Sequence, residues 1–158
     1  MEIAEIVARM EIHDALMRQL RAMDRHDWDA VYECFHPDAQ LHLPHSDGSV
    51  GEFVARERDV IYPDFLVSMH FAGNELIEID GDTATSELYS VCWHRVNRKP
   101  GEPHTDHVAG MRYLDRWERR DGAWRIVERT CPMDWSRLDR VEMAYPDEDH
   151  SWGADPTP

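Results

Sequence analysis

The sequence predicts an α+β fold, in which helices come first and a sheet of long strands follows. Apolar residues recur at helical spacing through residues 2–26, which contain no glycine or proline. Residues 68–131 have instead the character of strands, divided by the turn sequences Asp80-Gly81-Asp82, Lys99-Pro100-Gly101 and Asp121-Gly122. Helices that precede a run of strands, rather than alternating with them, are typical of the α+β class.

The length of the chain is that of one domain. With 158 residues it can bury a sizeable core, and we expect this domain to span residues 1–144. Residues 145–158 include few side chains to bury and several acidic ones. We therefore expect them to form an acidic, mobile C-terminal tail.

A strong excess of negative charge restricts the partners of this chain. There are 32 acidic and 17 basic residues, which gives a net charge of −15. Nucleic acids and anionic membranes would repel such a surface. The N-terminus lacks a basic segment followed by an apolar run, and no apolar stretch approaches the roughly 20 residues of a membrane span. We expect a cytoplasmic protein that binds neither nucleic acid nor membrane.

The elements between the first helix and the sheet are short. The pattern predicts a second helix capped by Asp27, then a strand, a turn and one or two helices interrupted at Pro63. In that order they occupy residues 27–35, 39–43, 45–51 and 52–67.

Four strands are expected in the sheet, at residues 68–79, 83–97, 105–119 and 123–131. Asp121-Gly122 is a good hairpin signal between the last two. Strict alternation places two sets of side chains on opposite faces of the third strand: Tyr113, Asp115 and Trp117, and Arg112, Leu114 and Arg116. The same rule places Arg129 on the face opposite to Trp124 and Ile126. Alternation alone does not tell which face points inward.

Asp24 lies on the apolar face of the first helix, where a carboxylate is unusual. At about 100° per residue it falls roughly 40° from Leu20, and His13 shares this face. Burying an unpaired carboxylate costs several kcal/mol, so a buried Asp24 needs a partner or a proton. Alternatively, the helix ends near Asp24, and the carboxylate reaches solvent or caps the next helix.

The cysteines and histidines do not form a recognisable metal motif. Cys34, Cys92 and Cys131 are far apart in sequence and include no CxxC, so we expect reduced, buried thiols. The closest histidine clusters are "LHLPH" at residues 41–45 and "HTDH" at residues 104–107, and neither has helical HxxxH spacing. We predict no metal site.

Three segments resemble the SnoaL-like proteins of the nuclear-transport-factor-2-like superfamily. They are "LRAMDRHDWDAVYECFHPDAQL", "SMHFAGNELIEIDGDTATSE" and "GMRYLDRWERRDGAWRIVERTCPMDW". They are most similar to the branch that holds scytalone dehydratase, bile-acid 7α-dehydratase and hexachlorocyclohexane dehydrochlorinase. The resemblance covers nearly the whole chain to residue 140. It implies a cone-shaped α+β barrel, with N-terminal helices packed in a strongly curved antiparallel or mixed sheet around an internal pocket.

The resemblance also implies catalytic roles. In the dehydratase and dehydrochlorinase members, an aspartate at the end of the first helix pairs with a histidine that opens a strand, and Asp24 and His70 match those positions. Arg129 matches an arginine on the last strand of the dehydrochlorinase. His94 has a spacing similar to that of a second histidine in scytalone dehydratase. Met23 stands where scytalone dehydratase has a tyrosine that helps to hold water, which argues against the same water-activating apparatus.

Four further side chains are candidate substrate contacts: Trp28, Tyr32, Tyr89 and Arg112. Tyr32 and Tyr89 have no clear counterpart among the tyrosines of scytalone dehydratase. Packing is the alternative role for Trp28. Arg112 could enter the pocket or pair with an acidic residue across the sheet.

These features predict a cofactor-free lyase that removes water by β-elimination from a small, largely apolar, cyclic molecule. His70, oriented by Asp24, would be the general base, Arg129 would stabilise negative charge and His94 would protonate the leaving hydroxyl. One alternative is an isomerase that acts on a steroid-like or polyketide-like substrate. Another is a non-catalytic subunit resembling the small subunit of ring-hydroxylating dioxygenases. We expect the enzyme to form a homodimer or homotrimer, for which Val91, Trp93, Val108 and Leu114 could supply the interface.

Overall fold

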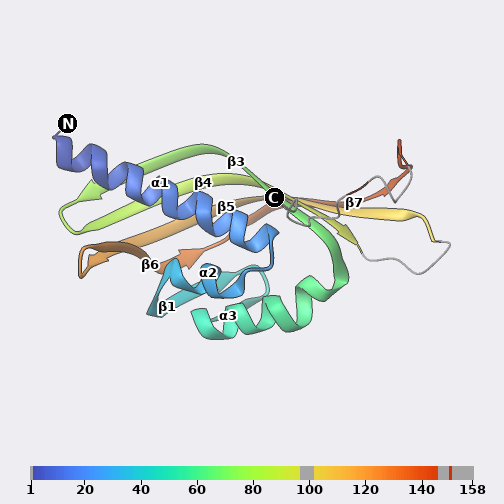
Figure 1. Cartoon of the computed structure of the whole chain (residues 1–158), viewed down its shortest axis with the longest axis horizontal. Coiled ribbons are helices and arrows are strands. Elements are labelled where there is room, and N and C mark those ends of the chain that lie inside the picture. Colours follow the sequence, from blue (N-terminus) through green and yellow to red (C-terminus); the bar gives the residue numbers. More distant parts are fainter. Residues whose placement is uncertain (1, 97–101, 146–149, 151–158) are drawn as a thin grey trace.

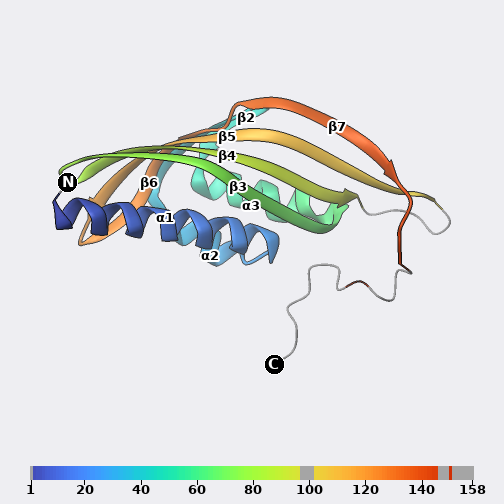
Figure 2. The same cartoon turned by 90° about the horizontal axis from the view of Figure 1, so that it is seen from above.

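In the computed structural model, helices from the first part of the chain lie on the concave side of one curved sheet (Figures 1 and 2). The structure describes residues 2–96, 102–145 and 150. The helices are α1 (Ile3–Asp24), α2 (Trp28–Glu33) and α3 (Val50–Arg56), and a π-helical turn, Glu57–Ile61, and a 3₁₀ turn, Tyr62–Asp64, follow α3. Within the described residues no helix is long and apolar enough to cross a membrane.

Among the described residues, seven strands form a single mixed sheet. They are β1 (Phe35–Leu43), β2 (Ser46–Ser49), β3 (Phe65–Asp80), β4 (Thr83–Val96), β5 (His104–Arg120), β6 (Ala123–Thr130) and β7 (Met133–Val141). The order is β2-β1-β6-β5-β4-β3, and β7 pairs with the first half of β5. β1 runs parallel to β6, whereas the other pairs are antiparallel. The sheet is curved but open, so the predicted α+β cone is confirmed without closure into a full barrel.

The first helix lies where the sequence predicts it, and it ends at Asp24. It ends here because His26 takes a left-handed backbone conformation, with φ at 56°, which a continuing helix cannot accommodate. Its buried side chains lie along one stripe that faces the sheet: Ala8, Ile12, Ala15, Leu16, Gln19, Leu20, Ala22 and Met23. The C-terminal end of the helix lies at the open edge of β3, the last strand of the sheet.

The elements after α1 match the prediction in part. The Asp27 carboxylate accepts a hydrogen bond from the Ala30 backbone N–H at 3.2 Å, which confirms the predicted cap of α2. The helix is shorter than expected, because Phe35 already belongs to β1 and pairs with Ile126 of β6. The segment 45–51, predicted as a turn, includes strand β2 and the start of α3, which a capping box between Ser49 and Glu52 fixes.

The four long strands agree with the predicted ones to within three residues at each end, as far as their residues are described. Strand β7 was not predicted. Six of its nine residues are exposed, so it lacks the alternation of buried and exposed positions that a half-buried strand shows. The predicted turn at residues 99–101 lies outside the described residues, and so does the predicted tail at 145–158, apart from residues 145 and 150.

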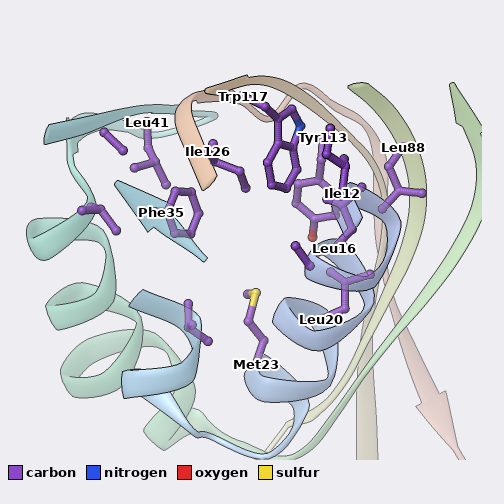
Figure 3. Close-up of a cluster of buried hydrophobic side chains, with 14 of the residues drawn as sticks. Ile12, Leu16, Leu20, Met23, Phe35, Leu41, Leu88, Tyr113, Trp117 and Ile126 are labelled. Carbon is purple, nitrogen blue, oxygen red and sulfur yellow. The ribbon is translucent and has the colours of Figure 1, made fainter. Parts of the chain in front are cut away.

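The core fills the space between α1, β1 and the concave face of the sheet (Figure 3). Phe35, Ile126 and Trp117 come from three strands and meet Ile12 and Leu16 of α1, all with at most 1% of their surface exposed. The buried Trp117 indole donates a hydrogen bond to Ser86 Oγ at 2.9 Å, which satisfies its polar group.

A β-bulge in β6 corrects the predicted direction of Arg129. Glu128 pairs with Arg116 and Ile126 pairs with Trp117, so Val127 is an extra residue on the β6 side. The extra residue reverses the alternation after it. Arg129 therefore points to the interior with Trp124 and Ile126, rather than to the opposite face as strict alternation predicts.

Candidate active site

A cavity of about 340 Å³ opens between the concave face of the sheet and the segment that follows α3. Most of its lining is apolar, which suits a small apolar ligand. Polar and titratable groups of the lining include Glu57 of the π-helical turn, Tyr62 of the 3₁₀ turn, His70 of β3, Cys92 and His94 of β4, and Arg129 of β6.

Asp24 and His70 form a hydrogen-bonded pair at this cavity. His70 Nδ1 lies 2.7 Å from Asp24 Oδ1, and the backbone N–H of His70 donates to Asp24 Oδ2 at 3.1 Å. Only 3% of the His70 side chain is exposed, compared with 21% of Asp24. His70 lies at the sixth position of β3, not at the strand's start as expected. The carboxylate fixes both the position and the tautomer of the ring, so Nε2 is left for chemistry.

The surroundings of His70 favour its protonated form. Burial opposes the charge and lowers the pKa, but hydrogen bonds to Asp24 and to the Cys92 thiol, together with their charges, raise the pKa to about 9. The protonated ring is therefore the major form at neutral pH. The neutral ring, which is the form that accepts a proton, is a strong base whose fraction rises as the pH approaches 9.

His94 lies beside His70 but has the opposite electrostatic character. The two ring centroids are 5.4 Å apart, and His94 Nδ1 lies 2.9 Å from Ser68 Oγ. Burial and the nearby charge of His70 lower the pKa of His94 to about 3. Its ring stacks on Phe65 at 4.4 Å. A neutral His94 can offer a hydrogen bond to a leaving group, but at neutral pH it carries no extra proton to transfer.

Arg129 is buried against the end of the cavity and is already paired. Its Nε and Nη2 donate to the two carboxylate oxygens of Asp115 at 2.6 and 2.7 Å, and Nη1 donates to Gln19 Oε1 at 2.7 Å. The guanidinium also lies over the ring of Tyr113, with its Cζ 4.6 Å from the ring centroid. Asp115 thus neutralises much of the charge that Arg129 could offer to an anion in the cavity.

The structure places the four predicted substrate contacts outside the cavity lining. Arg112 points to the convex face, because it has the parity opposite to Tyr113, and bonds Asp134 at 2.9 Å. Tyr89 lies beneath it on the same face. Tyr32 is exposed on α2. Trp28 packs edge-to-face on Tyr62 at 4.7 Å and so supports the cavity wall without lining it.

Two buried residues of the site were missed from the sequence. The Tyr62 hydroxyl lies near Ser68, yet meets hydrogen-bond geometry with no described residue. Glu57 is buried beside Arg56, and burial raises its pKa. Both residues border the π-helical turn, an irregularity that often marks functional sites but has no sequence signature of its own.

Gln19 is a third residue that was missed, although its spacing could have revealed it. It follows Leu16 by three residues and precedes Met23 by four, so it lies on the apolar stripe of α1. A polar side chain at such a position signals a buried partner, here Arg129. Across the described ranges, no group of three or more His, Cys, Asp or Glu side chains is arranged to hold a metal ion.

Comparisons with known proteins agree with this fold. The structure is similar to a hexachlorocyclohexane dehydrochlorinase of Novosphingobium barchaimii, with a TM-score of 0.76 and 18% identity over 90% of this chain and 97% of that one. It is also similar to a scytalone dehydratase-like protein of Novosphingobium aromaticivorans, with a TM-score of 0.75 and 17% identity over 90% and 95% of the two chains.

Sequence comparison gives the family. An uncharacterized protein of Mycobacterium tuberculosis is 28% identical over 131 residues, which are 82% of this chain and 87% of that protein. Residues 4–130 match the SnoaL-like domain family. The chain therefore belongs to the SnoaL-like family and has its curved, nuclear-transport-factor-2-like α+β fold.

Proposed function

We propose that this protein is a lyase that catalyses β-elimination, with water as the leading leaving group, on small, largely apolar, cyclic molecules. The observation that carries the proposal is the Asp24–His70 pair, with its buried imidazole, at a mostly apolar cavity. A histidine whose Nδ1 is held by a carboxylate presents Nε2 as a general base. The fold shared with a dehydrochlorinase and a scytalone dehydratase-like protein supports this reading.

β-Elimination requires a base and hydrogen-bond donors, and side chains of this protein can supply both. Nε2 of His70 takes the proton from the carbon next to an activating group. The Tyr62 hydroxyl and the neutral His94 ring can donate hydrogen bonds to the oxygen on which negative charge develops or to the departing hydroxyl. Arg129 acts chiefly by holding the cavity wall through Asp115 and Gln19.

Isomerisation is the second candidate, because it begins with the same proton transfer. An isomerase returns the proton to another carbon of the substrate, and His70 could make both transfers. The product separates the two reactions, since elimination releases a small molecule and isomerisation conserves the mass of the substrate.

The test is turnover of cyclic β-hydroxy ketones, followed by the absorbance of the conjugated product and by its mass. We expect His70→Ala to lower the rate about 10²–10⁴-fold, the usual contribution of a general base. His42→Ala is the matched control, because His42 pairs with Asp47 at an exposed site and does not line the cavity. Equal rates for the wild type and His70→Ala would remove His70 from the mechanism.

A further inference from the structure

Cys92 is a cavity-lining thiol that the proposed elimination does not use. It is a free cysteine, 2% exposed, on β4. Its Cα partner on β3 is His70, so the two residues lie directly across from each other on neighbouring strands.

The backbone geometry brings these two side chains together. The His70 N–H donates to Asp24 and therefore points away from β4. An antiparallel pair whose N–H groups point outward is of the non-hydrogen-bonded kind, with Cα atoms only about 4.5 Å apart and side chains close. Both side chains line the same cavity, and Nε2 is the imidazole nitrogen open to the thiol because Nδ1 is bound to Asp24. Carboxylate, imidazole and thiol thus stand in the order that activates a nucleophilic cysteine.

The three cysteines differ in their surroundings. Burial would raise the pKa of Cys92, but hydrogen bonds from His70, Tyr113 and Ser90 and the charge of His70 outweigh it and lower the pKa. Cys131 lines the same cavity without such a partner, and burial raises its pKa to about 12. Burial also raises the pKa of Cys34. Reactivity follows the thiolate form, so it should be concentrated at Cys92.

We propose that Cys92 is a covalent capture site for small apolar electrophiles, specifically α,β-unsaturated carbonyl compounds. The mostly apolar cavity fits such molecules in size and character. A separate observation points to their carbonyl group: Tyr62 lines the same cavity with 3% of its surface exposed, and its hydroxyl, although near Ser68, meets hydrogen-bond geometry with no described residue. It can donate to a carbonyl oxygen whose β-carbon faces the thiol.

The reaction is a conjugate addition that conserves atoms and electrons. With the thiol proton held by His70, the sulfur forms a bond to the β-carbon while the carbon–carbon π bond breaks. The electron pair moves to the carbonyl oxygen, where Tyr62 stabilises it by a hydrogen bond. The His70 imidazolium then returns the proton to the α-carbon. The net change is addition of S–H across the double bond, and nothing is oxidised or reduced overall.

Capture needs no turnover, so it holds or fails independently of the proposed elimination. If both are correct, a conjugated ketone formed by loss of water is at once a product and a covalent inhibitor. Activity without capture supports only the proposed function, and capture without activity supports only this inference.

The experiment incubates the full chain with 2-cyclohexen-1-one near neutral pH and follows adducts by intact mass and peptide mapping. We expect a single adduct, on Cys92, formed at least about tenfold faster than on Cys131 or Cys34, because the pKa of Cys92 is lowered and the pKa values of the other two are raised. Cys92→Ser should abolish the adduct. Cys131→Ser removes the other thiol of the same cavity and should leave the rate of adduct formation at Cys92 unchanged. His70→Gln should slow it at least about tenfold.

Comparison of the three native cysteines within the wild-type chain needs no variant and is independent of any folding defect. The same chain unfolded in urea shows that each thiol can react with the probe. Equal labelling of the three cysteines in the folded protein, or no adduct at Cys92 while the unfolded chain reacts, would overturn the proposal.

Discussion

At the scale of single residues, Asp24 shows how far sequence reasoning reaches. Helical spacing placed it on the apolar face. The helix also ends there, as the alternative had it, but the carboxylate binds His70 rather than capping the next helix. The partner lies 46 residues away, and no local pattern connects the two positions. Only the family resemblance proposed His70. The neutral state of His94 and the position of the Tyr62 hydroxyl at the cavity depend on burial, which spacing does not determine.

The first residue-scale prediction concerns the charge on His70. Replacing Asp24 by Asn removes the carboxylate that raises the pKa of the ring, so this pKa should fall well below 9 while Cys92 remains. Histidine NMR across pH measures it. Glu75→Gln is the matched control, because Glu75 holds the exposed His13 at 2.8 Å and should leave His70 unchanged. An unshifted His70 signal in Asp24→Asn would show that the pair does not form in solution.

The second concerns stability and pH. The pKa of His70 in the folded protein, about 9, exceeds its unfolded value of about 6.5, so its proton stabilises the fold. This stabilisation is fully present below pH ~6.5 and is lost as the pH rises through ~9. Asp24, Cys92, His94 and Glu57 are the titratable groups that act on the ring.

Urea unfolding at several pH values tests this dependence. The free energy of unfolding of the wild type should decrease by a few kcal/mol between about pH 6.5 and pH 9.5. His70→Gln should lose much less over the same range, since it has no ring to titrate. Parallel curves for the two proteins would contradict the assignment.

At the scale of elements, the alternation of apolar and polar residues predicted the half-buried strands correctly. The predictions failed where the backbone is irregular or a strand is mostly exposed. Residues 83–94 alternate cleanly between buried positions and more exposed ones, and β4 and β5 follow the prediction to within one residue at their described ends. The bulge at Val127 reverses the direction of Arg129, and the mostly exposed β7 lacks alternation. A bulge adds one residue without a distinctive composition, so single-sequence reasoning cannot place it.

The bulge permits a buried ion pair that should dominate the stability of β6. Asp115 accepts two hydrogen bonds from Arg129, and both residues are at most 2% exposed. Asp115→Asn leaves an uncompensated buried charge and should lower the free energy of unfolding by about 3–5 kcal/mol. Urea denaturation measures it. Asp134→Asn, which breaks the exposed pair with Arg112, should leave stability almost unchanged. Similar losses in both variants would mean that burial does not set the cost.

At the scale of the whole molecule, the sequence predicted helices and a sheet but not the sheet's curvature, which the resemblance supplied. The curved sheet leaves a convex face with exposed apolar side chains. Phe71, Val91, Gly110 and Trp135 lie in one row across four strands, and Trp93 occupies the next row on this face. A Cβ at Gly110 would come within 2.4 Å of two Trp135 ring atoms, so the indole lies directly over the glycine. Such a patch is typical of surfaces that bind a partner.

We expect this face to join copies of the chain. Trp93→Glu places a charge in the patch and should shift the protein towards monomer in analytical ultracentrifugation, because charges are disfavoured at the centre of an interface. Met10→Glu, at an exposed position of α1 on the other side of the sheet, is the control and should leave the mass unchanged. A wild type that sediments as a monomer would refute the expectation.

The bond between the His70 N–H and Asp24 also protects the rim of the sheet. β3 is the last strand in the order, so outward N–H groups along it are open to a strand of another molecule. The Asp24 carboxylate, at the end of α1, accepts a hydrogen bond from one of these N–H groups, so that this group is no longer open. A substitution chosen to disable the base, such as Asp24→Ala, therefore also uncovers a place where chains can add edge to edge. Loss of activity in that variant could reflect aggregation, a consequence that Asp24→Asn, which keeps an oxygen acceptor, largely avoids.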